Sequence, residues 1–201
     1  MVAIIDYGMG NVASVQKALN FLKIDSVVTN NHKLISESDC IILPGVGSFM
    51  QGMTNLEEKG LDVLLTHEVL ERKKKFLGIC LGMQLIIEQG TEPLDYKGLG
   101  WIKGSVKKID TEGLRVPHMG WNNISVINNV YYRGIDDLDF YFIHSYHMIP
   151  EDKQVVAATV NYGIDLVASI QSENIFATQF HPEKSQIAGL TLLRNFFEFN
   201  A

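Results

Sequence analysis

Three side chains in this sequence are of the types that perform nucleophilic catalysis, namely Cys80, His181 and Glu183. Cys80 lies in a Gly-x-Cys-x-Gly pattern, with Gly78 and Gly82 two residues away on either side. A thiolate is a strong nucleophile, a nearby imidazole can take and return a proton, and a carboxylate can orient that imidazole. The residue types therefore predict a thiol-dependent reaction at a carbonyl group.

The residues around Cys80 predict the element that positions it. The apolar run Phe76 to Ile79 predicts a buried strand, and the segment Leu81 to Gln89 predicts a helix. A nucleophile on a sharp strand-to-helix turn is a nucleophile elbow, here with Cys in place of Ser. Glycines at positions 78 and 82 let the crowded turn close. The helix N-terminus favours the thiolate, and the Leu81 amide is free to hold an oxyanion.

His181 follows a predicted strand, Ile175 to Phe180, which Pro182 prevents from continuing. Glu183 is close enough to orient the ring. Taken alone, a Cys at the end of a core strand is often a packing residue, and a His at a strand end is often a surface or core residue. The order Cys, His, Glu along the chain also differs from the Ser, Asp, His order of hydrolases with a Ser elbow.

The bulk composition limits the class of protein. A chain of 201 residues is expected to form one domain, residues 1–201, with a sizeable core. A net charge of −6 argues against a broad nucleic-acid surface or an anionic membrane as partner. We expect no membrane span or signal peptide. Two Cys do not make a disulfide framework, so a reducing cytoplasm is the expected location.

The remaining pattern predicts an α/β fold with three layers, flavodoxin-like, in which a mostly parallel central sheet gains antiparallel strands late in the chain. Further apolar and amphipathic segments predict strands at 2–5, 26–29, 39–43, 140–147 and 162–170 and helices from 12, over 61–70 and near the C-terminus. In that last helix Ile187, Leu190, Leu193 and Phe197 are expected to share one buried face. The basic run 72–75 is interpreted as a solvated helix end.

Two loops leave strands at the edge where open α/β sheets bind ligands. In the first, Gly8 to Asn11, a dinucleotide site is disfavoured because Ala13 replaces the third glycine of that motif. The second, Pro44 to Ser48, contains two glycines that let the backbone approach a ligand. His144 and His147 have the spacing of a metal pair, but no acid or Cys completes the set, so no metal and no other cofactor is expected.

The two long motifs Gly-Ile-Cys-Leu-Gly-Met-Gln and Gln-Phe-His-Pro-Glu-Lys-Ser resemble those of the class I (triad) glutamine amidotransferases. Over its whole length the chain is most similar to the HisH glutaminase subunits of imidazole glycerol phosphate synthase. The resemblance implies that L-glutamine is hydrolysed to glutamate and ammonia. It further implies a heterodimer with a HisF-type (β/α)₈ synthase subunit, which uses the ammonia to make imidazole glycerol phosphate and aminoimidazole carboxamide ribotide in histidine biosynthesis.

The resemblance also assigns roles to individual residues. Catalysis falls to Cys80, His181 and Glu183, and the backbone of the oxyanion hole to Val46, Gly47 and Leu81. The glutamine contacts it implies are Gly47, Gln84, Glu92, Ser145 and Tyr146. The residues it places at the synthase interface are Gly8, Gly10, Asn11, His118, Met119, Trp121, Tyr141 and Lys184.

Three other functions were considered. The same glutaminase chemistry serves sugar-amidating enzymes of surface-polysaccharide pathways, and the sequence does not separate the two partners. A stand-alone Cys hydrolase of the same fold would need no partner and no preference for glutamine, which Gln84 and Glu92 argue against. A non-catalytic binding module would be expected to lack a member of the Cys, His and Glu set.

Overall fold

The computed structural model describes residues 1–127 and 129–199. Its strands are β1 (Val2–Ile5), β2 (Ser26–Thr29), β3 (Cys40–Gly45), β4 (Lys75–Cys80), β5 (Ile87–Gly90), β6 (Tyr96–Lys97), β7 (Ile102–Lys108), β8 (His118–Val126), β9 (Asp139–His144), β10 (Tyr146–Pro150), β11 (Val156–Tyr162), β12 (Ile164–Ser172) and β13 (Ile175–Thr178). Its α-helices are α1 (Val12–Phe21), α2 (His32–Glu37), α3 (Phe49–Glu58), α4 (Leu61–Thr66), α5 (Leu81–Leu85) and α6 (Gln186–Glu198). A π-helical segment, η1 (His67–Glu71), continues α4, and the short 3₁₀ turns are η2 (Val130–Tyr132), η3 (Lys153–Val155) and η4 (Pro182–Lys184).

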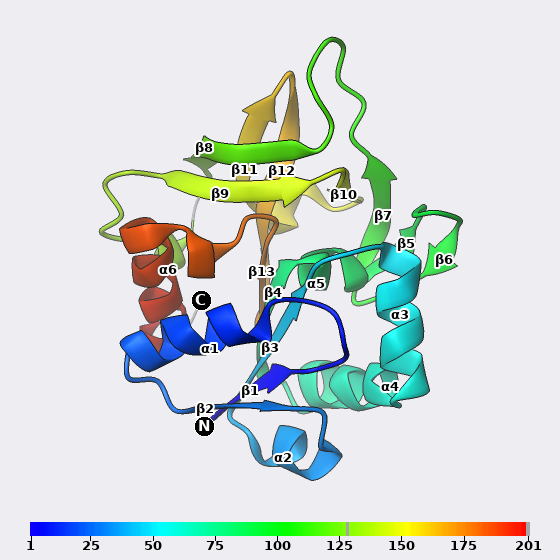
Figure 1. The fold of residues 1–201 in the computed structure, drawn as a ribbon, viewed down its shortest axis with the longest axis vertical. Helices are drawn as coiled ribbons and strands as arrows, with labels where there is room; N and C mark the ends of the chain where they lie inside the picture. Colours follow the sequence, from blue (N-terminus) through cyan, green and yellow to red (C-terminus); the bar gives the residue numbers. More distant parts are fainter. Residues whose placement is uncertain (128, 200–201) are drawn as a thin grey trace.

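The larger sheet has the strand order β2-β1-β3-β4-β13-β12-β11-β8-β9 within the described residues. The first five strands in this order, β2, β1, β3, β4 and β13, run parallel to one another. The other four, β12, β11, β8 and β9, each pair antiparallel with the strand before them. In Figure 1 these antiparallel strands rise above the parallel part of the molecule. A second sheet has the order β10-β7-β5-β6. The expected mostly parallel sheet with late antiparallel strands is thus confirmed.

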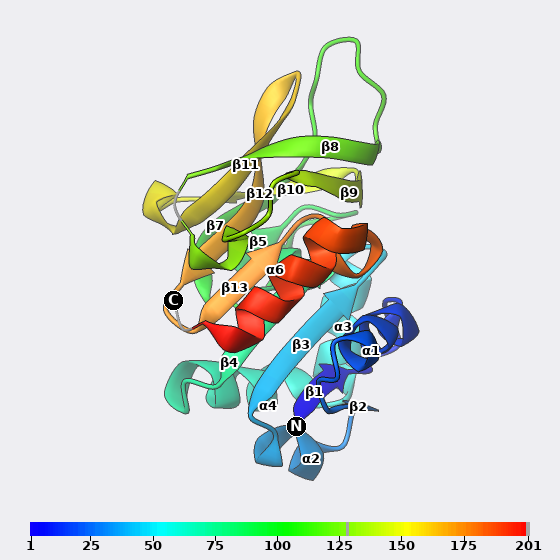
Figure 2. The ribbon, with the colours of Figure 1, turned by 90° about the vertical axis from the view of Figure 1, so that its left-hand side faces the viewer.

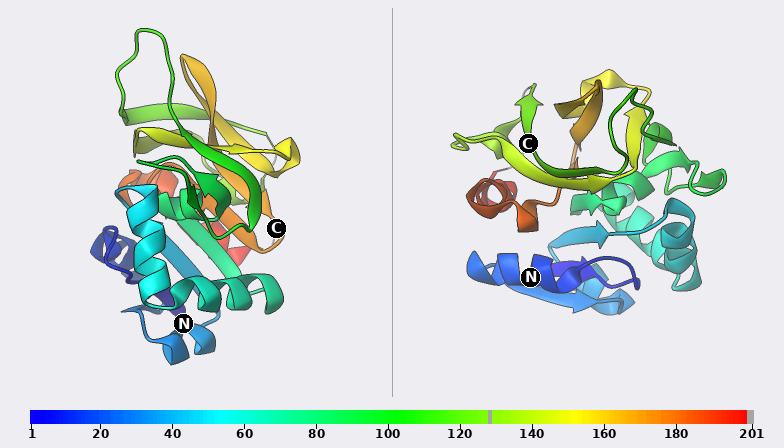
Figure 3. Two further views of the ribbon diagram at one scale, coloured as in Figure 1. Left: turned by 90° about the vertical axis from the view of Figure 1, so that its right-hand side faces the viewer. Right: turned by 45° about the horizontal axis from the view of Figure 1, so that its top comes forward.

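Helices cover both faces of the parallel strands, which is the expected three-layer arrangement. Alternate side chains along a strand point to opposite faces, so Ile4 and Ile42 pack with α1 and α6. Ala3 and Ile41 pack on the other side with α3 and α4. Figure 2 shows α1 and α6 on one side, and the left view of Figure 3 shows α3 and α4 on the other. Within the described ranges, no helix is both long and apolar enough to span a membrane.

Three local predictions were wrong. The helix after Cys80 ends at Leu85, and residues Ile87–Gly90 form β5. The cause is a contact with a later segment of the chain, because the carbonyls of residues 85–88 accept hydrogen bonds from the amides of residues 98–102. In α6 the buried face includes Leu192 and Phe196, whereas Ile187 is 81% exposed.

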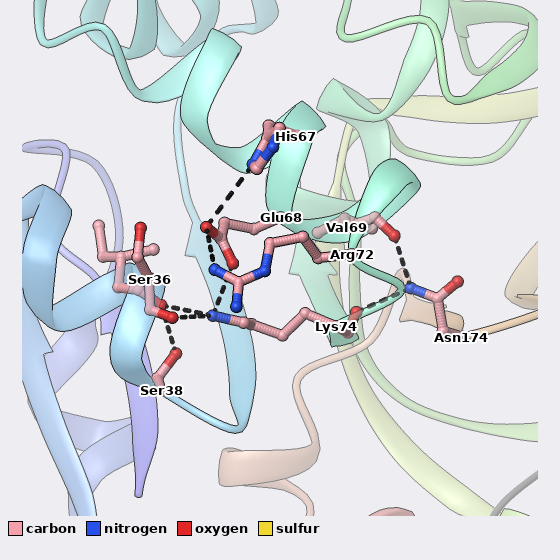
Figure 4. Close-up of polar contacts among 9 residues, drawn as sticks. Ser36, Ser38, His67, Glu68, Val69, Arg72, Lys74 and Asn174 are labelled. Carbon is pink, nitrogen blue, oxygen red and sulfur yellow. Dashed lines mark hydrogen bonds and ion pairs between the residues drawn. The ribbon is translucent and has the colours of Figure 1, made fainter.

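The third correction concerns the basic run 72–75, which is only partly solvated. The ammonium of Lys74 is buried, lies 2.8 Å from a carboxylate oxygen of Glu68 and donates to the carbonyls of Ile35 and Ser36. Burial alone would raise the pKa of Glu68, but its contacts with Lys74 and Arg72 outweigh burial and lower it. Figure 4 shows this cluster, which connects η1 and the segment after it to the C-terminal part of α2. It stabilises the end of the sheet away from Cys80.

Candidate active site

The backbone at Cys80 has the strained geometry of a nucleophile elbow. Cys80 adopts φ 55° and ψ −107°, a region that residues with a side chain rarely occupy. The turn closes because its flanking residues are glycines. A Cβ on Gly82 would overlap the carbonyl oxygen of Leu43, and one on Gly78 would lie 2.9 Å from the carbonyl oxygen of Gly82. The sulfur is therefore presented at the end of β4, as the sequence predicted.

The pairing of β3 and β13 with β4 places the predicted catalytic segments at one edge of the sheet. Gly45, the last residue of β3, pairs with Cys80 of β4, and Thr178 of β13 pairs with Ile79. The chain leaving β3 carries the Val46–Gly47 loop, and the chain leaving β13 carries His181. Because neighbouring parallel strands end at the same edge, residues far apart in the sequence meet beside the sulfur.

His181 and Glu183 form a buried pair. Nδ1 of His181 lies 2.8 Å from Oε1 of Glu183, and both side chains are at most 3% exposed. Burial lowers the pKa of His181, but its interactions with Cys80 and then Glu183 outweigh burial and raise the pKa to about 10. The imidazole Nε2 is buried and makes no hydrogen bond of normal geometry with the described residues. Glu183 thus fixes one ring nitrogen and leaves the other for proton transfer beside the sulfur.

Two further groups contact the sulfur, and neither was predicted from the sequence. Sγ of Cys80 lies 3.8 Å from the carbonyl oxygen of Ile143, and Nε2 of Gln179 lies 3.7 Å from Sγ. Strand alternation was the available signal for Gln179, because a residue two positions before His181 points to the same side of the chain.

A cavity of about 380 Å³ opens over Cys80. Its lining is Val46, Gly47, Ser48, Cys80, Leu81, Gln84, Glu92, Pro117, Ile143, His144, Ser145 and Tyr146. The lining contains every residue predicted for the oxyanion hole and for glutamine binding. The residues that line the cavity come from five separate segments of the chain, which the fold brings together around Cys80.

Two cavity residues have the chemistry to hold an amino acid. Glu92 presents a carboxylate whose pKa is raised by burial, against the lowering effect of a hydrogen bond from the Phe49 amide at 3.2 Å. A negative carboxylate suits a substrate ammonium group. Gln84 is buried and donates from Nε2 to the Tyr146 carbonyl at 2.9 Å and to Oε1 of Gln179 at 3.0 Å. Its amide is therefore held rigidly at the cavity wall.

The loop predicted to form the oxyanion hole is exposed and adaptable. Val46 is 41% exposed, and Gly47 has φ +117°, which is strained for a residue with a Cβ. A Cβ on Gly47 would also lie 2.6 Å from the methyl carbon of Met9. Met9, passed over in the sequence analysis, thus packs against this loop. A Cβ on Gly10 would lie 3.0 Å from Cα of Gly45, which is closer than ordinary contact, and the φ of Gly10 is +108°.

Three residues predicted for the synthase interface, Trp121, Tyr141 and Lys184, lie close together on one face of the molecule. Trp121 of β8 pairs with Tyr141 of β9, and the ring centroids are 6.0 Å apart. Nζ of Lys184 lies 5.9 Å from the Tyr141 ring, and Met119 is 58% exposed. Gly8 and Asn11 are exposed at the start of α1.

His118 does not lie on that face, because it is 2% exposed. Its Nδ1 lies 2.9 Å from Nε2 of His144, whose own Nδ1 lies 2.9 Å from the Tyr146 carbonyl oxygen. Burial lowers the pKa of both rings, to about 4 for His118 and to about 3 for His144. His118 is therefore a neutral core residue, and its predicted place at the interface is corrected. The residues described contain no group of three potential metal ligands.

Known proteins of similar sequence match this chain over nearly its whole length. The family model described as glutamine amidotransferase class-I matches residues 3–199. A relative from Campylobacter jejuni strain RM1221, "Imidazole glycerol phosphate synthase subunit HisH 1", is 48% identical over 98% of this chain and 98% of its own length. The "Imidazole glycerol phosphate synthase subunit HisH" of Aquifex aeolicus is 46% identical over 96% of this chain and 94% of its own.

Two solved structures show the same fold at low sequence identity. One, titled "Crystal structure of glutamine amidotransferase", has a TM-score of 0.78 at 20% identity and covers 98% of both chains. PurLQS from Thermotoga maritima has a TM-score of 0.75 at 18% identity and covers 98% of this chain and 97% of its own.

Proposed function

The chain belongs to the class-I glutamine amidotransferase family, and from this premise we propose that it is the glutaminase subunit of an imidazole glycerol phosphate synthase. The observation that carries the proposal is the meeting of the Cys80 elbow, the His181–Glu183 pair and a cavity lined by Gln84 and Glu92. The HisH names of relatives with 46–48% identity support the histidine pathway over a sugar-amidating one. Residues 1–201 are taken as a single amidotransferase domain.

The reaction begins when substrate glutamine enters the cavity, with its ammonium group at Glu92 and its carboxylate at the backbone of Ser145 and Tyr146. The Cys80 thiolate attacks the side-chain carbonyl carbon, and the carbonyl π electrons move to oxygen. Backbone amides of Gly47 or Val46 and of Leu81 hold this oxyanion.

Collapse of the tetrahedral intermediate breaks the C–N bond. His181 gives its Nε2 proton to the leaving nitrogen, and ammonia departs. A thioester to Cys80 remains. His181 then takes a proton from water, the hydroxide attacks the thioester, and glutamate leaves as the sulfur returns to its starting state. Glu183 keeps Nδ1 of the ring protonated through both steps, so that Nε2 exchanges the proton.

Ammonia released into water near neutral pH is mostly protonated and loses its nucleophilicity. The proposed partner is therefore a HisF-type (β/α)₈ synthase subunit that docks over the cavity mouth and receives ammonia directly. Met119, Trp121, Tyr141 and Lys184 form the proposed docking face, together with Gly8, Gly10 and Asn11. A reducing compartment such as the cytoplasm suits the free thiol.

The test is glutamate release from glutamine by the purified chain, alone and with a HisF-type subunit and its nucleotide substrate. We expect low activity alone and a rise of several orders of magnitude in the complex. Cys80→Ala in the same complex should release no glutamate. Full activity of the isolated chain would contradict the coupling, and stimulation by a sugar-amidating enzyme in place of the HisF-type subunit would change the pathway.

A further inference from the structure

Gln179 lies at the end of β13, is fully buried and is the side chain that joins the sulfur to the glutamine cavity. We propose that Gln179 is a positioning residue for Cys80. Its side-chain amide holds an N–H group against the sulfur of Cys80 and is itself held in place by a hydrogen bond from Gln84. The inference rests on the proposed glutaminase function and adds to it a residue outside the Cys, His and Glu set.

The hydrogen-bonding partners of Gln179 determine which end of its side-chain amide is the nitrogen and which is the oxygen. The backbone carbonyl of Tyr146 can only accept, so the end of Gln84 that lies 2.9 Å from it must be the NH₂ group. The same NH₂ group lies 3.0 Å from Gln179, which must therefore present its oxygen there. The other end of the Gln179 amide is then NH₂, and it faces Sγ of Cys80 at 3.7 Å.

The N–H of Gln179 opposes the effect of the Ile143 carbonyl, which favours the protonated thiol. The Ile143 carbonyl oxygen lies 3.8 Å from Sγ and can accept a hydrogen bond only while the sulfur carries its proton. An N–H donor favours the opposite state, because a thiolate accepts a hydrogen bond more strongly than a thiol does. Without the Gln179 donor, the carbonyl would shift the balance toward the unreactive thiol.

The amide of Gln179 is held by a chain of contacts that reaches the cavity wall. Its oxygen is fixed by Gln84, and Gln84 is fixed by the Tyr146 carbonyl, which also lies 2.9 Å from Nδ1 of His144. Loss of Gln84 removes the hydrogen bond that holds the Gln179 oxygen away from the sulfur. Substitution at position 84 should therefore affect the thiol as well as glutamine binding.

Other titratable groups also face this region. His181 from the segment after β13 interacts with the sulfur directly, and Glu183 supports it. Tyr7, which follows β1, is buried. Its pKa is raised mainly by burial and, to a smaller extent, by the nearby Cys80. His144 of β9 is kept neutral by burial. A substitution at Gln179 removes none of these groups, so a change in the reactivity of the sulfur can be assigned to the lost amide.

The experiment measures the rate at which iodoacetamide alkylates Cys80 as a function of pH, followed by mass spectrometry of the Cys80 peptide. It uses the full chain without partner or glutamine. Gln179→Met keeps the volume and removes the N–H. We expect the pH of half-maximal rate to rise by about one unit, which corresponds to a roughly tenfold slower reaction below that pH. In the complex, kcat for glutamine should fall more than KM rises, because Gln84 and Glu92 remain.

Thr178→Val is the matched control. Thr178, the last residue of β13, directly precedes Gln179 and is also fully buried, and its hydroxyl donates to the Phe180 carbonyl at 2.9 Å rather than to the sulfur. We expect an unchanged alkylation profile. If Gln179→Met does not fold, Gln179→Leu replaces it; this variant also removes the amide N–H without adding a charge, and it should shift the profile in the same direction.

The outcomes separate this inference from the proposed function. A wild-type alkylation profile in the folded Gln179 variant, or an equal shift in Thr178→Val, overturns the role of Gln179 even when the wild-type complex hydrolyses glutamine normally. Conversely, a wild-type complex without glutaminase activity overturns the proposed function. The alkylation profile is measured without substrate, so its shift tests the role of Gln179 independently of that result.

Discussion

Replacing Glu183 by Gln tests whether this carboxylate orients and charges His181. The substitution preserves size and leaves an amide oxygen able to accept from Nδ1, which lies 2.8 Å from Oε1. What it removes is the negative charge. The second carboxylate oxygen, Oε2, is buried without a hydrogen-bond partner among the described residues, so the amide NH₂ can occupy that place without displacing another donor. We therefore expect a folded protein with the ring still in its productive tautomer.

The size of the effect follows from the type of hydrogen bond. A buried bond to a charged group contributes roughly 1.5–3 kcal/mol and a neutral one roughly 0.5–1.5 kcal/mol, so the loss is about 1–1.5 kcal/mol. This corresponds to a fall of about one unit in the pKa of His181. An equal loss in the transition state slows kcat about tenfold. A loss of about four orders of magnitude would instead indicate the wrong tautomer.

The same change alters stability in a pH-dependent manner. The pKa of His181 is raised to about 10 from an ordinary value of 6.5. The stabilisation from the protonated ring is complete below pH 6.5 and is lost as the pH rises through 10. Glu183→Gln should therefore lower the free energy of unfolding by about 1 kcal/mol at pH 6, and the difference from wild type should shrink near pH 10.

Urea unfolding at pH 6 and pH 10, with kcat of the complex, measures both effects. Glu173→Gln is the control, since Glu173 is exposed and pairs with Lys73 at 2.6 Å far from the cavity. We expect neither quantity to change in the control. The reasoning is refuted if Glu183→Gln keeps wild-type kcat, or if its stability loss is as large at pH 10 as at pH 6.

Four further predictions concern other parts of the molecule. Cys80→Ala should leave no glutaminase activity or trapped thioester, with a circular dichroism spectrum like that of wild type. Lys184→Ala should weaken binding of the HisF-type subunit about tenfold in calorimetric titration, or about 1.4 kcal/mol, without lowering the melting temperature. Lys74→Met should cost about 2–4 kcal/mol in urea unfolding, because it removes the buried cation 2.8 Å from the carboxylate of Glu68 and leaves the more exposed Arg72 at 3.3 Å and His67 at 3.7 Å, and adding Glu68→Gln should recover part of that loss. Gly82→Ala should displace the elbow and abolish Cys80 alkylation at neutral pH, because its Cβ has no room beside the neighbouring strand.

The sequence was sufficient to predict the parallel strands and the elbow, since each is a local pattern. Apolar runs define β1, β3 and β4, and the spacing of glycines around Cys80 marks the turn. Strand ends in an open parallel sheet then bring His181 beside Cys80. The strands and the elbow were predicted from periodicity and glycine spacing, whereas the oxyanion-hole and glutamine-binding residues followed from the family resemblance.

What the sequence could not provide depends on contacts between distant segments. Residues Ile87–Gly90 form a strand because residues 98–102 bind the carbonyls that a longer helix would have used. Lys74 is buried because Glu68 meets it from η1. His118 is buried because β8 pairs with β9 in a register that turns it toward His144. In each case local propensity was overridden by a partner far away in the chain.

The strain at Cys80 explains why its flanking glycines were more informative than the catalytic side chains themselves. A residue at φ 55° and ψ −107° would relax if its surroundings allowed, so the backbone on both sides must be held tightly. That tight contact is visible in Gly82, which touches the backbone of β3, and in Gly78, which touches that of Gly82. Side chains such as His181 are common in many settings, but an apolar strand bounded by glycines that admit no Cβ has few explanations. The positions without side chains thus give the elbow its sequence signature, and the chemistry of the site depends on the backbone contacts that those glycines permit.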